Sequence, residues 1–451
     1  MRQFDDSERY VVTGMGLVSP VGNDPETAWQ AILAGEHGIQ YARDTLFKGY
    51  ESLPIYVAAP VRNFDLTQDP AFADRRNDIR GKWDTSQQFV LWSGAQALRM
   101  AGLNSAGSTR VEDHGLDPKR FGIYMGTGIG GANHLAEAAV LLEKEKEQYA
   151  AALAEDDELT MERLRDSTRI NPKLILKTLI GRVAGTPSIE FGARAFWEGV
   201  LKECASGNAA IISAIEAIKL GKADVVLAGG VEGDITPYST GLFGAARAVS
   251  RNRDPDTAAR PFDQRRDGLT MGQGAGALVI ETKEHAQRRG ATIISEIIGY
   301  GENADARGET DPDPDSVVEC MELALERTGR RIENVAINPH ATSTPIGDES
   351  EMKVIRRTFT PDQTVGITAI KSYTGHTFGG AGAVEAVISN LMLRDQIVPA
   401  ILNLEEQIEE AAGYEHAMNP DRPIEGEIDM VVNNSFGFGG NNAITIFAHP
   451  R

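Results

Sequence analysis

Cysteine and histidine are scarce in this 451-residue chain, so the setting of each can be compared. Cys204 stands in Glu203-Cys204-Ala205-Ser206-Gly207-Asn208, directly before residues 209–218, an apolar run of good helix formers. A thiol at the start of a buried helix meets unpaired N–H groups and the positive end of the helix dipole. Both favour the thiolate and lower the thiol pKa. Cys204 is therefore a candidate nucleophile; the alternative is a small buried hydrophobe, because free cysteine is often buried.

Two of the eight histidines lie in distinctive segments. His340 follows a predicted strand in Asn338-Pro339-His340-Ala341-Thr342, and His376 closes Lys371-Ser372-Tyr373-Thr374-Gly375-His376 at a predicted helix start. A lone histidine in such a loop is more often structural. Two of them, with Lys371 nearby and a cysteine at a helix start, favour a site for acyl transfer. Cysteine would carry the acyl group, and the imidazoles would stabilise an enolate or oxyanion.

The surroundings of Cys204 and His376 follow the same plan, roughly 170 residues apart. Cys204 is followed by the helix at 209–218 and a strand predicted at 223–230. His376 is followed by a helix predicted at 383–393 and a strand predicted at 430–434. This repeat predicts a duplicated α/β core in which two helix N-termini face one site. The charged, Ala- and Leu-rich stretch 135–166 predicts a helical cap inserted into that core. Cys320 falls inside a predicted helix at 315–327, where packing explains it.

A glycine-rich loop, Gly126-Thr127-Gly128-Ile129-Gly130-Gly131, follows a strand predicted at 121–125. It satisfies the G-x-G-x-x-G pattern of dinucleotide-binding folds. Such a site also needs a second strand that ends in an acidic residue about 20 positions on. The helical stretch 135–166 stands there instead. We therefore do not expect a dinucleotide site.

Composition limits the partners and the location. A net charge of −20 and a pI of about 4.9 argue against general binding of nucleic acid or anionic membranes. An anionic partner would need a local basic patch, and residues 75–82 offer the densest one; the alternative is a solvated loop. Two distant cysteines give neither a disulfide framework nor metal-ligand spacing, which suits a reducing cytoplasm. The sequence has no apolar run of about 18 residues, so we predict no membrane span. Its acidic start predicts no signal peptide.

Five ordered motifs resemble the 3-oxoacyl-[acyl-carrier-protein] synthases, the elongating ketosynthases of fatty acid and polyketide synthesis in the thiolase-like superfamily. The motifs are residues 243–250 (FGAARAVS), 260–263 (RPFD), 266–268 (RDG), 340–348 (HATSTPIGD) and 371–376 (KSYTGH). Matching stretches run from residues 11–16 to 434–441. The resemblance implies a thiolase-like α/β fold with two duplicated halves in a layered α-β-α-β-α core. The halves would span 8–285, with the cap insertion at about 132–180, and 290–451.

The resemblance also implies a reaction, the decarboxylative Claisen condensation of an acyl chain on Cys204 with malonyl-carrier protein. The products would be 3-oxoacyl-carrier protein, CO2 and free carrier protein. Cys204 resembles the nucleophile, and His340 and His376 resemble the pair that drives malonyl decarboxylation. Lys371 resembles the lysine that orders the histidine cluster, and Glu351 is its supporting acidic residue.

Further residues are placed by the same resemblance. Backbone N–H groups of Cys204 and Phe438 would form the oxyanion hole. The substrate-binding residues implied are Phe438, Phe436, Thr342, Thr344 and Phe243. Carrier-protein docking would use the basic residues Arg75, Arg76, Arg80, Lys82 and Arg247. The resemblance implies a homodimer, a transient acyl carrier protein partner with a phosphopantetheine arm, no metal and no other cofactor, no nucleic acid and no membrane insertion.

The chain departs from the family pattern beside the nucleophile. Lys202-Glu203 stands where the family usually has Thr-Ala, and Ala195-Phe196 where it usually has Gly-Pro. The carboxylate of Glu203 would oppose a thiolate, whereas Lys202 would favour it. One alternative is therefore a non-condensing partner subunit of the chain-length-factor type, although such subunits generally lack the cysteine. A thiolase is the other alternative, but it would need a second cysteine near the C-terminus.

Overall fold

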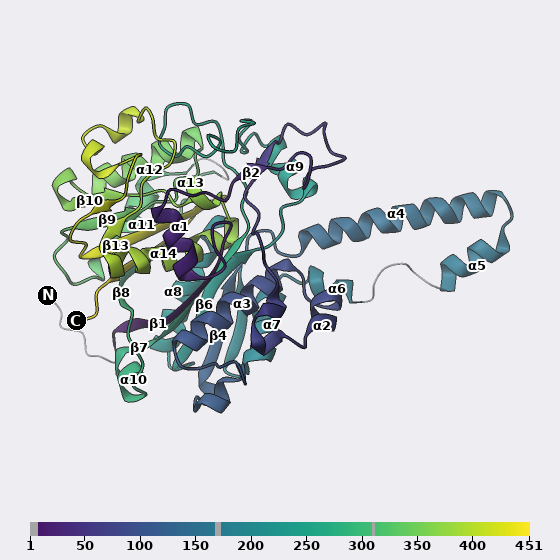
Figure 1. The fold of residues 1–451 in the computed structure, drawn as a ribbon, viewed down its shortest axis with the longest axis horizontal. Coiled ribbons are helices and arrows are strands. Elements are labelled where there is room, and N and C mark those ends of the chain that lie inside the picture. Colours follow the sequence, from purple (N-terminus) through teal and green to yellow (C-terminus); the bar gives the residue numbers. More distant parts are fainter. Residues whose placement is uncertain (1–7, 167–172, 309–311) are drawn as a thin grey trace.

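The computed structural model describes residues 8–166, 173–308 and 312–451 (Figure 1). Ten strands form one sheet in the order β10-β9-β13-β14-β8-β1-β7-β6-β4-β5. The first half of the chain supplies β1 (Tyr10–Val18), β4 (Phe121–Gly126), β5 (Phe196–Val200), β6 (Val225–Glu232) and β7 (Gly274–Thr282). The second half supplies β8 (Ser295–Ala304), β9 (Val335–Asn338), β10 (Thr364–Ile367), β13 (Met430–Gly437) and β14 (Asn441–Ala448).

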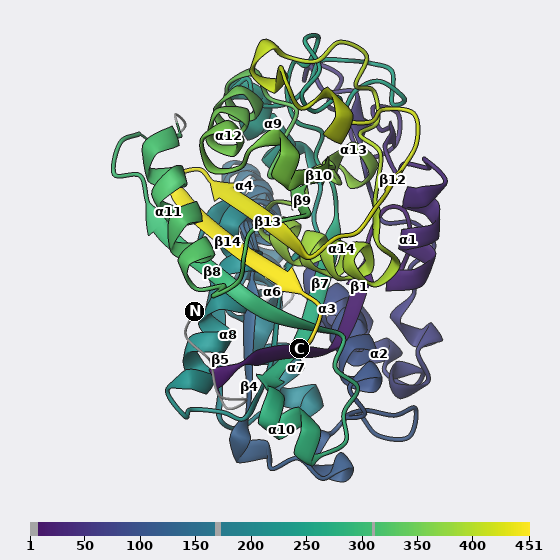
Figure 2. The same ribbon diagram turned by 90° about the vertical axis from the view of Figure 1, so that its left-hand side faces the viewer.

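The two halves have the same topology. Numbered within its own half, each set of five strands lies in the order 3-2-4-5-1, and the two sets meet at their first strands. In each half strands 2, 3 and 4 are parallel, while strands 4, 5 and 1 are antiparallel neighbours. The junction is a short antiparallel pairing of Tyr10–Val12 with residues 295–297. Figure 2 shows β13 and β14 beside β8, with β1 beyond it. The predicted duplication is confirmed.

Two helices form the central layer between the halves of the sheet. The helix α8 (Ser206–Lys219) contacts β4 and β6 of its own half and β8 and β14 of the other. The helix α14 (Ala381–Asp395) contacts β13 and also β1, β6 and β7. The outer faces are covered by α3 (Thr85–Met100) and α7 (Arg182–Phe191) on one half and by α11 (Pro314–Glu326) on the other, with α12 (Pro345–Thr358) packed on α11. The layers therefore alternate as α-β-α-β-α, which confirms the predicted fold class.

The central helices touch backbone to backbone at their first turns. A Cβ atom on Gly207 of α8 would lie 2.7 Å from the backbone nitrogen of Ala383 on α14. A Cβ atom on Gly382 of α14 would lie 2.9 Å from the backbone nitrogen of Asn208. Only glycine permits so close an approach, since these separations are shorter than those that real Cβ atoms show. The two helix N-termini therefore meet at the centre of the molecule.

The predicted insertion is a helical arm. It contains α4 (Ala132–Ala154), α5 (Glu158–Asp166) and α6 (Leu174–Thr178), and Figure 1 shows α4 and α5 projecting from the body near α9. Its leucines Leu135, Leu142 and Leu153 are more than half exposed. Their spacing of 7 and 11 residues puts them on one face of α4. The arm therefore carries apolar surface outside the core.

The remaining elements are short. The helices are α1 (Pro25–Leu33), α2 (Arg76–Gly81), α9 (Pro237–Ala245), α10 (Lys283–Arg288) and α13 (Lys371–Thr374). The strands β2 (Gln40–Tyr41) and β3 (Val57–Ala58) pair with each other, as do β11 (Ile397–Val398) and β12 (Ile424–Glu425). Among the described residues, no helix combines the length and apolar character needed to cross a bilayer.

Candidate active site

Cys204 lies in a single 3-10 turn, Glu203–Ala205, directly before the first residue of α8. The hydroxyl of Ser206 fixes this turn: it accepts from the Lys202 N–H at 2.8 Å and lies 2.7 Å from the Glu203 carbonyl oxygen. Glu203 has φ = 46°, in the left-handed region that few non-glycine residues adopt. The thiol of Cys204 is buried and lines a cavity. The sequence therefore placed the cysteine correctly, at the start of a buried helix.

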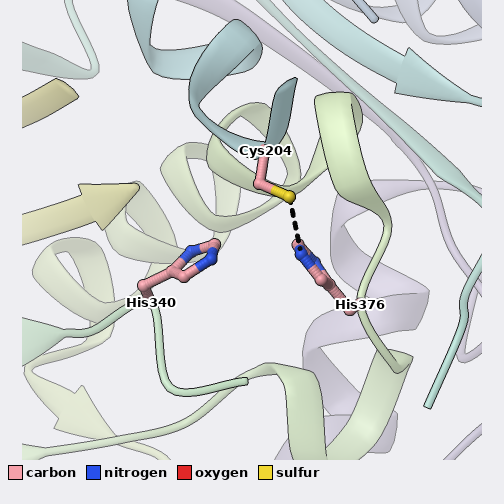
Figure 3. Close-up of side chains that lie close together, drawn as sticks. All are labelled: Cys204, His340 and His376. Carbon is pink, nitrogen blue, oxygen red and sulfur yellow. Dashed lines mark hydrogen bonds between the residues drawn. The ribbon is translucent and has the colours of Figure 1, made fainter. Parts of the chain in front are cut away.

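His376 comes from the other half of the chain and meets Cys204 directly. It follows Gly375, whose φ of 63° turns the chain between α13 and the segment that leads to α14. Its Nε2 lies 3.0 Å from the Cys204 Sγ (Figure 3). Its ring stacks on Phe378 with 4.6 Å between the ring centroids. One residue at the start of each central helix thus contributes to a thiol–imidazole pair.

His340 completes the cluster from the loop after β9. Its ring centroid lies 5.1 Å from that of His376, with the planes nearly perpendicular. The potential ligand atoms of Cys204, His340 and His376 all lie within 4.8 Å of one another. Figure 3 shows the two rings facing the sulfur from either side. The structure therefore brings together the three residues that the sequence singled out.

Both imidazoles are neutral at physiological pH. Burial lowers the pKa of His340 and of His376 well below the usual value, and the positive charge of Lys371 acts in the same direction. The Nδ1 atoms of both rings are buried and have no hydrogen-bond partner within the described parts of the chain. No partner there fixes the tautomer, so each neutral ring can carry its proton on Nδ1 and accept at Nε2, or carry it on Nε2 and donate into the cavity.

The pKa of Cys204 corrects one expectation. We predicted that the helix N-terminus lowers the thiol pKa, but burial raises the pKa of Cys204 to about 12. Lys371 and a hydrogen bond from the Phe438 N–H oppose this rise, while Glu232 and Glu203 add to it. Loss of hydration is the largest effect because the sulfur is buried. At neutral pH Cys204 is a thiol, and His376 Nε2 is the base beside it.

Lys371 does not touch the cavity but pairs with a carboxylate that the sequence analysis missed. Its Nζ lies 2.5 Å from Glu385 Oε1, and both side chains are buried. Glu385 sits on α14, where residues 381–393 are otherwise apolar or small, apart from Ser389 and Asn390. A single acid in such a helix was the available signal. Burial raises the pKa of Glu385 to about 7, against the effect of Lys371.

Glu351 supports the His340 loop through its backbone. One carboxylate oxygen accepts from the His340 N–H at 2.7 Å, and the other accepts from the Ala341 N–H at 2.7 Å. Asn434 donates to the first oxygen at 3.0 Å. Ala341 has φ = 37°, so this carboxylate holds a strained backbone in place. Burial raises the pKa of Glu351. We interpret Glu351 as an anchor of the loop rather than of the imidazole.

Cys204, His340 and His376 line a cavity of about 420 Å³. Of the predicted site residues, those on its wall are Cys204, His340, His376, Glu351, Thr342, Thr344, Phe436, Phe438 and Arg247. Phe243 lies behind the wall, with its ring centroid 4.7 Å from that of Phe378 and 6.2 Å from that of Phe438. The hydroxyls of Thr342 and Thr344 are 2.9 Å apart. The cavity therefore has an aromatic side and a side with paired hydroxyls.

The basic residues proposed for docking differ in setting. Arg75 makes a bidentate ion pair with Glu190, at 2.6 and 2.8 Å, and Lys82 lies 2.6 Å from Asp78. Arg76 is exposed at the start of α2, and the side chain of Arg80 lies outside the described part of the structure. Arg247 is exposed and, of the four whose side chains are described, it is the one that lines the cavity. The docking role of these residues stays a prediction.

The glycine-rich loop after β4 is occupied by the protein itself. The Glu232 carboxylate accepts from the N–H groups of Gly128 at 2.9 Å, Ile129 at 3.0 Å and Gly130 at 3.2 Å. These donors would otherwise bind a phosphate. Burial raises the pKa of Glu232 to about 7, against these hydrogen bonds. The loop is structural, which agrees with the expectation that it binds no dinucleotide.

A thiol and two imidazoles could also bind a metal ion. Ligand bonds of about 2.3 Å for sulfur and 2.0 Å for nitrogen place tetrahedral ligands roughly 3.5 Å apart. The separation of 3.0 Å between Cys204 Sγ and His376 Nε2 is that of a hydrogen bond. The geometry therefore suits a thiol–imidazole pair better than a zinc site. The expectation that no metal is needed stays a prediction.

The fold and the site together define a class of protein. A duplicated α-β-α-β-α core places one cysteine and two neutral imidazoles in a single buried cavity, which is the arrangement of a condensing acyltransferase with a thiolase-like fold. The chain belongs to the beta-ketoacyl synthase family. The N-terminal domain of that family matches residues 7–286, and its C-terminal domain matches residues 294–405.

Curated relatives and solved structures agree with this assignment. The chain is 36% identical to 3-oxoacyl-[acyl-carrier-protein] synthase 2 of Coxiella burnetii, over 98% of this chain and 99% of the relative. It is 34% identical to the chloroplastic 3-oxoacyl-[acyl-carrier-protein] synthase I of Arabidopsis thaliana, over 99% and 88%. A beta-ketoacyl synthase from Burkholderia phymatum has a TM-score of 0.81 and 30% identity, covering 98% of this chain and all of the other.

Proposed function

We propose that this chain catalyses decarboxylative condensation of an acyl group on Cys204 with malonyl-carrier protein. The convergence of Cys204, His376 and His340 in one buried cavity carries this proposal, because the reaction needs a nucleophile and two oxyanion donors away from water. The names of the curated relatives, 3-oxoacyl-[acyl-carrier-protein] synthases, support the substrate class.

The first step loads the enzyme. Cys204 Sγ attacks the thioester carbon of acyl-carrier protein while its proton moves to His376 Nε2, 3.0 Å away. The N–H groups of Cys204 and Phe438 stabilise the oxyanion. The carbon–sulfur bond to the pantetheine arm then breaks, and the leaving sulfur takes the proton from His376. Both imidazoles are then neutral, and the remaining proton of His376 moves from Nδ1 to Nε2 before the second step.

The second step forms the carbon–carbon bond. His340 and His376 donate from Nε2 to the thioester oxygen of malonyl-carrier protein. The electron pair of the bond to the carboxylate becomes the enolate, and CO2 leaves. The enolate carbon attacks the acyl carbon on Cys204, the carbon–sulfur bond breaks, and one proton from solvent restores the thiol. Neutral imidazoles suit this step because an imidazolium would protonate the enolate carbon more readily.

The partner and assembly follow the same proposal. Acyl carrier protein would dock transiently at the cavity mouth beside Arg247, and its phosphopantetheine arm would pass Thr342 and Thr344. No metal or other cofactor is needed, and the setting is cytoplasmic.

β5 is the end strand of the sheet and exposes half of Trp197. An open edge with an exposed aromatic residue supports a homodimer in which two β5 strands pair.

A condensation assay with acyl- and malonyl-carrier protein tests this function. We expect the wild type to form 3-oxoacyl-carrier protein and CO2, and Cys204→Ala to form neither an acyl-enzyme nor product. Mass spectrometry of the loaded protein locates the acyl group. Wild-type protein that binds carrier protein but gives no product would favour the chain-length-factor-like alternative.

A further inference from the structure

The turn that carries Phe438 is tied to the residue before the nucleophile. Phe438, Gly439 and Gly440 connect β13 to β14, and Asn441 is the first residue of β14. The Asn441 Nδ2 donates to Glu203 Oε2 at 2.6 Å and lies 3.3 Å from the Phe438 carbonyl oxygen. One amide group thus links the Glu203 carboxylate to both ends of the turn.

Backbone hydrogen bonds hold the glycine end of the turn: the Gly440 N–H donates to the Gly437 carbonyl oxygen at 3.2 Å, and the Gly440 carbonyl oxygen accepts from the Asp305 N–H at 2.9 Å. Gly439 and Gly440 have φ of 79° and 74°, a conformation that glycine adopts without cost, and they offer no side chain for packing. The Phe438 ring is more than one-third exposed. The Phe438 N–H nevertheless faces the Cys204 thiol closely enough to lower its pKa. At the Phe438 end, the side-chain contact to the backbone comes from Asn441, whose position the Glu203 carboxylate fixes.

Lys202 makes a second connection of the same kind. Its ammonium group pairs with Glu302 on β8, and Glu302 is the register partner of Ala443 on β14. A Cβ atom on Gly437 would lie 2.8 Å from the Lys202 carbonyl oxygen, so the two backbones are in direct contact. Both residues that precede Cys204 are thus attached to β14 or to its neighbour. Neither lines the cavity.

The charge of Glu203 does not help the nucleophile. A carboxylate one residue away raises the pKa of the Cys204 thiol and so opposes the thiolate. Glu203 also adopts a left-handed conformation, which is unfavourable for a non-glycine residue. Two unfavourable effects at one position leave the hydrogen bond to Asn441 as the favourable contribution of this side chain.

We propose that Glu203 is a positioning residue that, through Asn441, holds the Phe438 N–H at the Cys204 sulfur. The ion pair between Lys202 and Glu302 holds the Lys202 backbone against Gly437, the residue before Phe438. The two residues before the cysteine thereby join the halves of the chain at the oxyanion hole. This inference rests on the proposed function, because the Phe438 N–H matters as an oxyanion donor.

Glu203→Gln and Glu203→Ala form a matched pair. Both remove the charge, but glutamine keeps an oxygen that can accept from Asn441. We expect Glu203→Gln to lose at most about threefold in kcat and Glu203→Ala roughly 10- to 100-fold, with KM nearly unchanged in both. The upper limit for the loss in kcat is about 10²- to 10³-fold, the loss that follows removal of a whole oxyanion donor. Asn441→Ala should match Glu203→Ala, and the double variant should be no worse than either.

Alkylation of Cys204 by iodoacetamide tests the inference apart from condensation. At one pH, Glu203→Ala should react more slowly than Glu203→Gln, because only alanine frees the Phe438 N–H from the sulfur. Equal alkylation and equal kcat in the two variants would overturn the inference, as would a double variant that multiplies the single losses. A wild type that alkylates as expected but condenses nothing would refute the proposed function alone. Thermal unfolding of each variant reports a loss of folding separately.

Discussion

Gly207→Ala tests whether the contact between α8 and α14 sets the geometry of the reacting pair. The new Cβ atom would lie 2.7 Å from the Ala383 nitrogen, whereas ordinary contact begins at 3.4 Å. The difference, 3.4 − 2.7 = 0.7 Å, is the separation that the helices must gain. Cys204 precedes α8 and His376 precedes α14, so the displacement acts on the distance of 3.0 Å between Sγ and Nε2.

The size of the effect follows from this displacement. A misplacement of about 1 Å can cost a factor of about 10² in rate. On a logarithmic scale, 0.7 Å corresponds to roughly 25-fold, and half of that displacement corresponds to roughly 5-fold. We therefore expect Gly207→Ala to slow acyl-enzyme formation by about 5- to 25-fold. Overpacking should also lower the free energy of unfolding by about 1–3 kcal/mol.

Rapid-quench measurement of acyl-enzyme formation, with thermal unfolding in parallel, checks this prediction. Ser213→Ala is the control, because Ser213 lies on the same helix and is only half-buried. Gly382→Ala should reproduce the defect from α14, where its Cβ would lie 2.9 Å from the Asn208 nitrogen. A Gly207→Ala variant that acylates at the wild-type rate would show that the helix contact does not position the pair.

Three further predictions concern single groups. His340→Ala should lower the decarboxylation rate about 10²- to 10³-fold, measured as CO2 release, through loss of one oxyanion donor; a loss below tenfold would exclude that role. Alkylation of wild-type Cys204 should rise with pH without a plateau below about pH 9, because burial raises the thiol pKa to about 12; a midpoint near pH 7 would show that the helix N-terminus dominates. Burial raises the pKa of Glu232 from 4.5 to about 7, so the folded state holds this proton longer than the unfolded state. Its contribution to stability should fall by about 3 kcal/mol between pH 4.5 and 7, and Glu232→Gln should flatten that part of the profile measured by denaturant unfolding; identical slopes would contradict it.

The sequence predicted the elements that carry chemistry because their patterns are local. The apolar run after Cys204 became α8, and the stretch after His376 became α14. The strand predicted at 223–230 became β6 with a shift of two residues at either end, and the strand predicted before His340 became β9. The repeated plan around Cys204 and His376 was enough to predict the duplication. The settings of His340 and Lys371 marked them as candidates, and family resemblance then supplied their roles and added Glu351.

Effects that arise only in three dimensions were missed. The pKa of Cys204 depends on burial by both halves of the chain, which no local pattern reports. Glu385 and Glu232 look like ordinary helix and strand residues until their partners, Lys371 and the glycine-rich loop, are placed beside them. The edge strand β5 was not predicted, because the consecutive residues Trp197 and Glu198 are both exposed, so burial does not alternate along this strand.

The shared 3-2-4-5-1 strand order has a consequence for the origin of the site. The nucleophile stands at the first turn of α8, and a histidine stands ahead of the equivalent helix, α14, so neither half alone holds a reacting pair. An ancestor with only one such half would have needed two copies of itself to bring two helix N-termini together. Fusion of such copies would allow one helix start to keep a thiol and the other an imidazole. The two halves share one strand order, whereas the reacting side chains at their two helix starts differ.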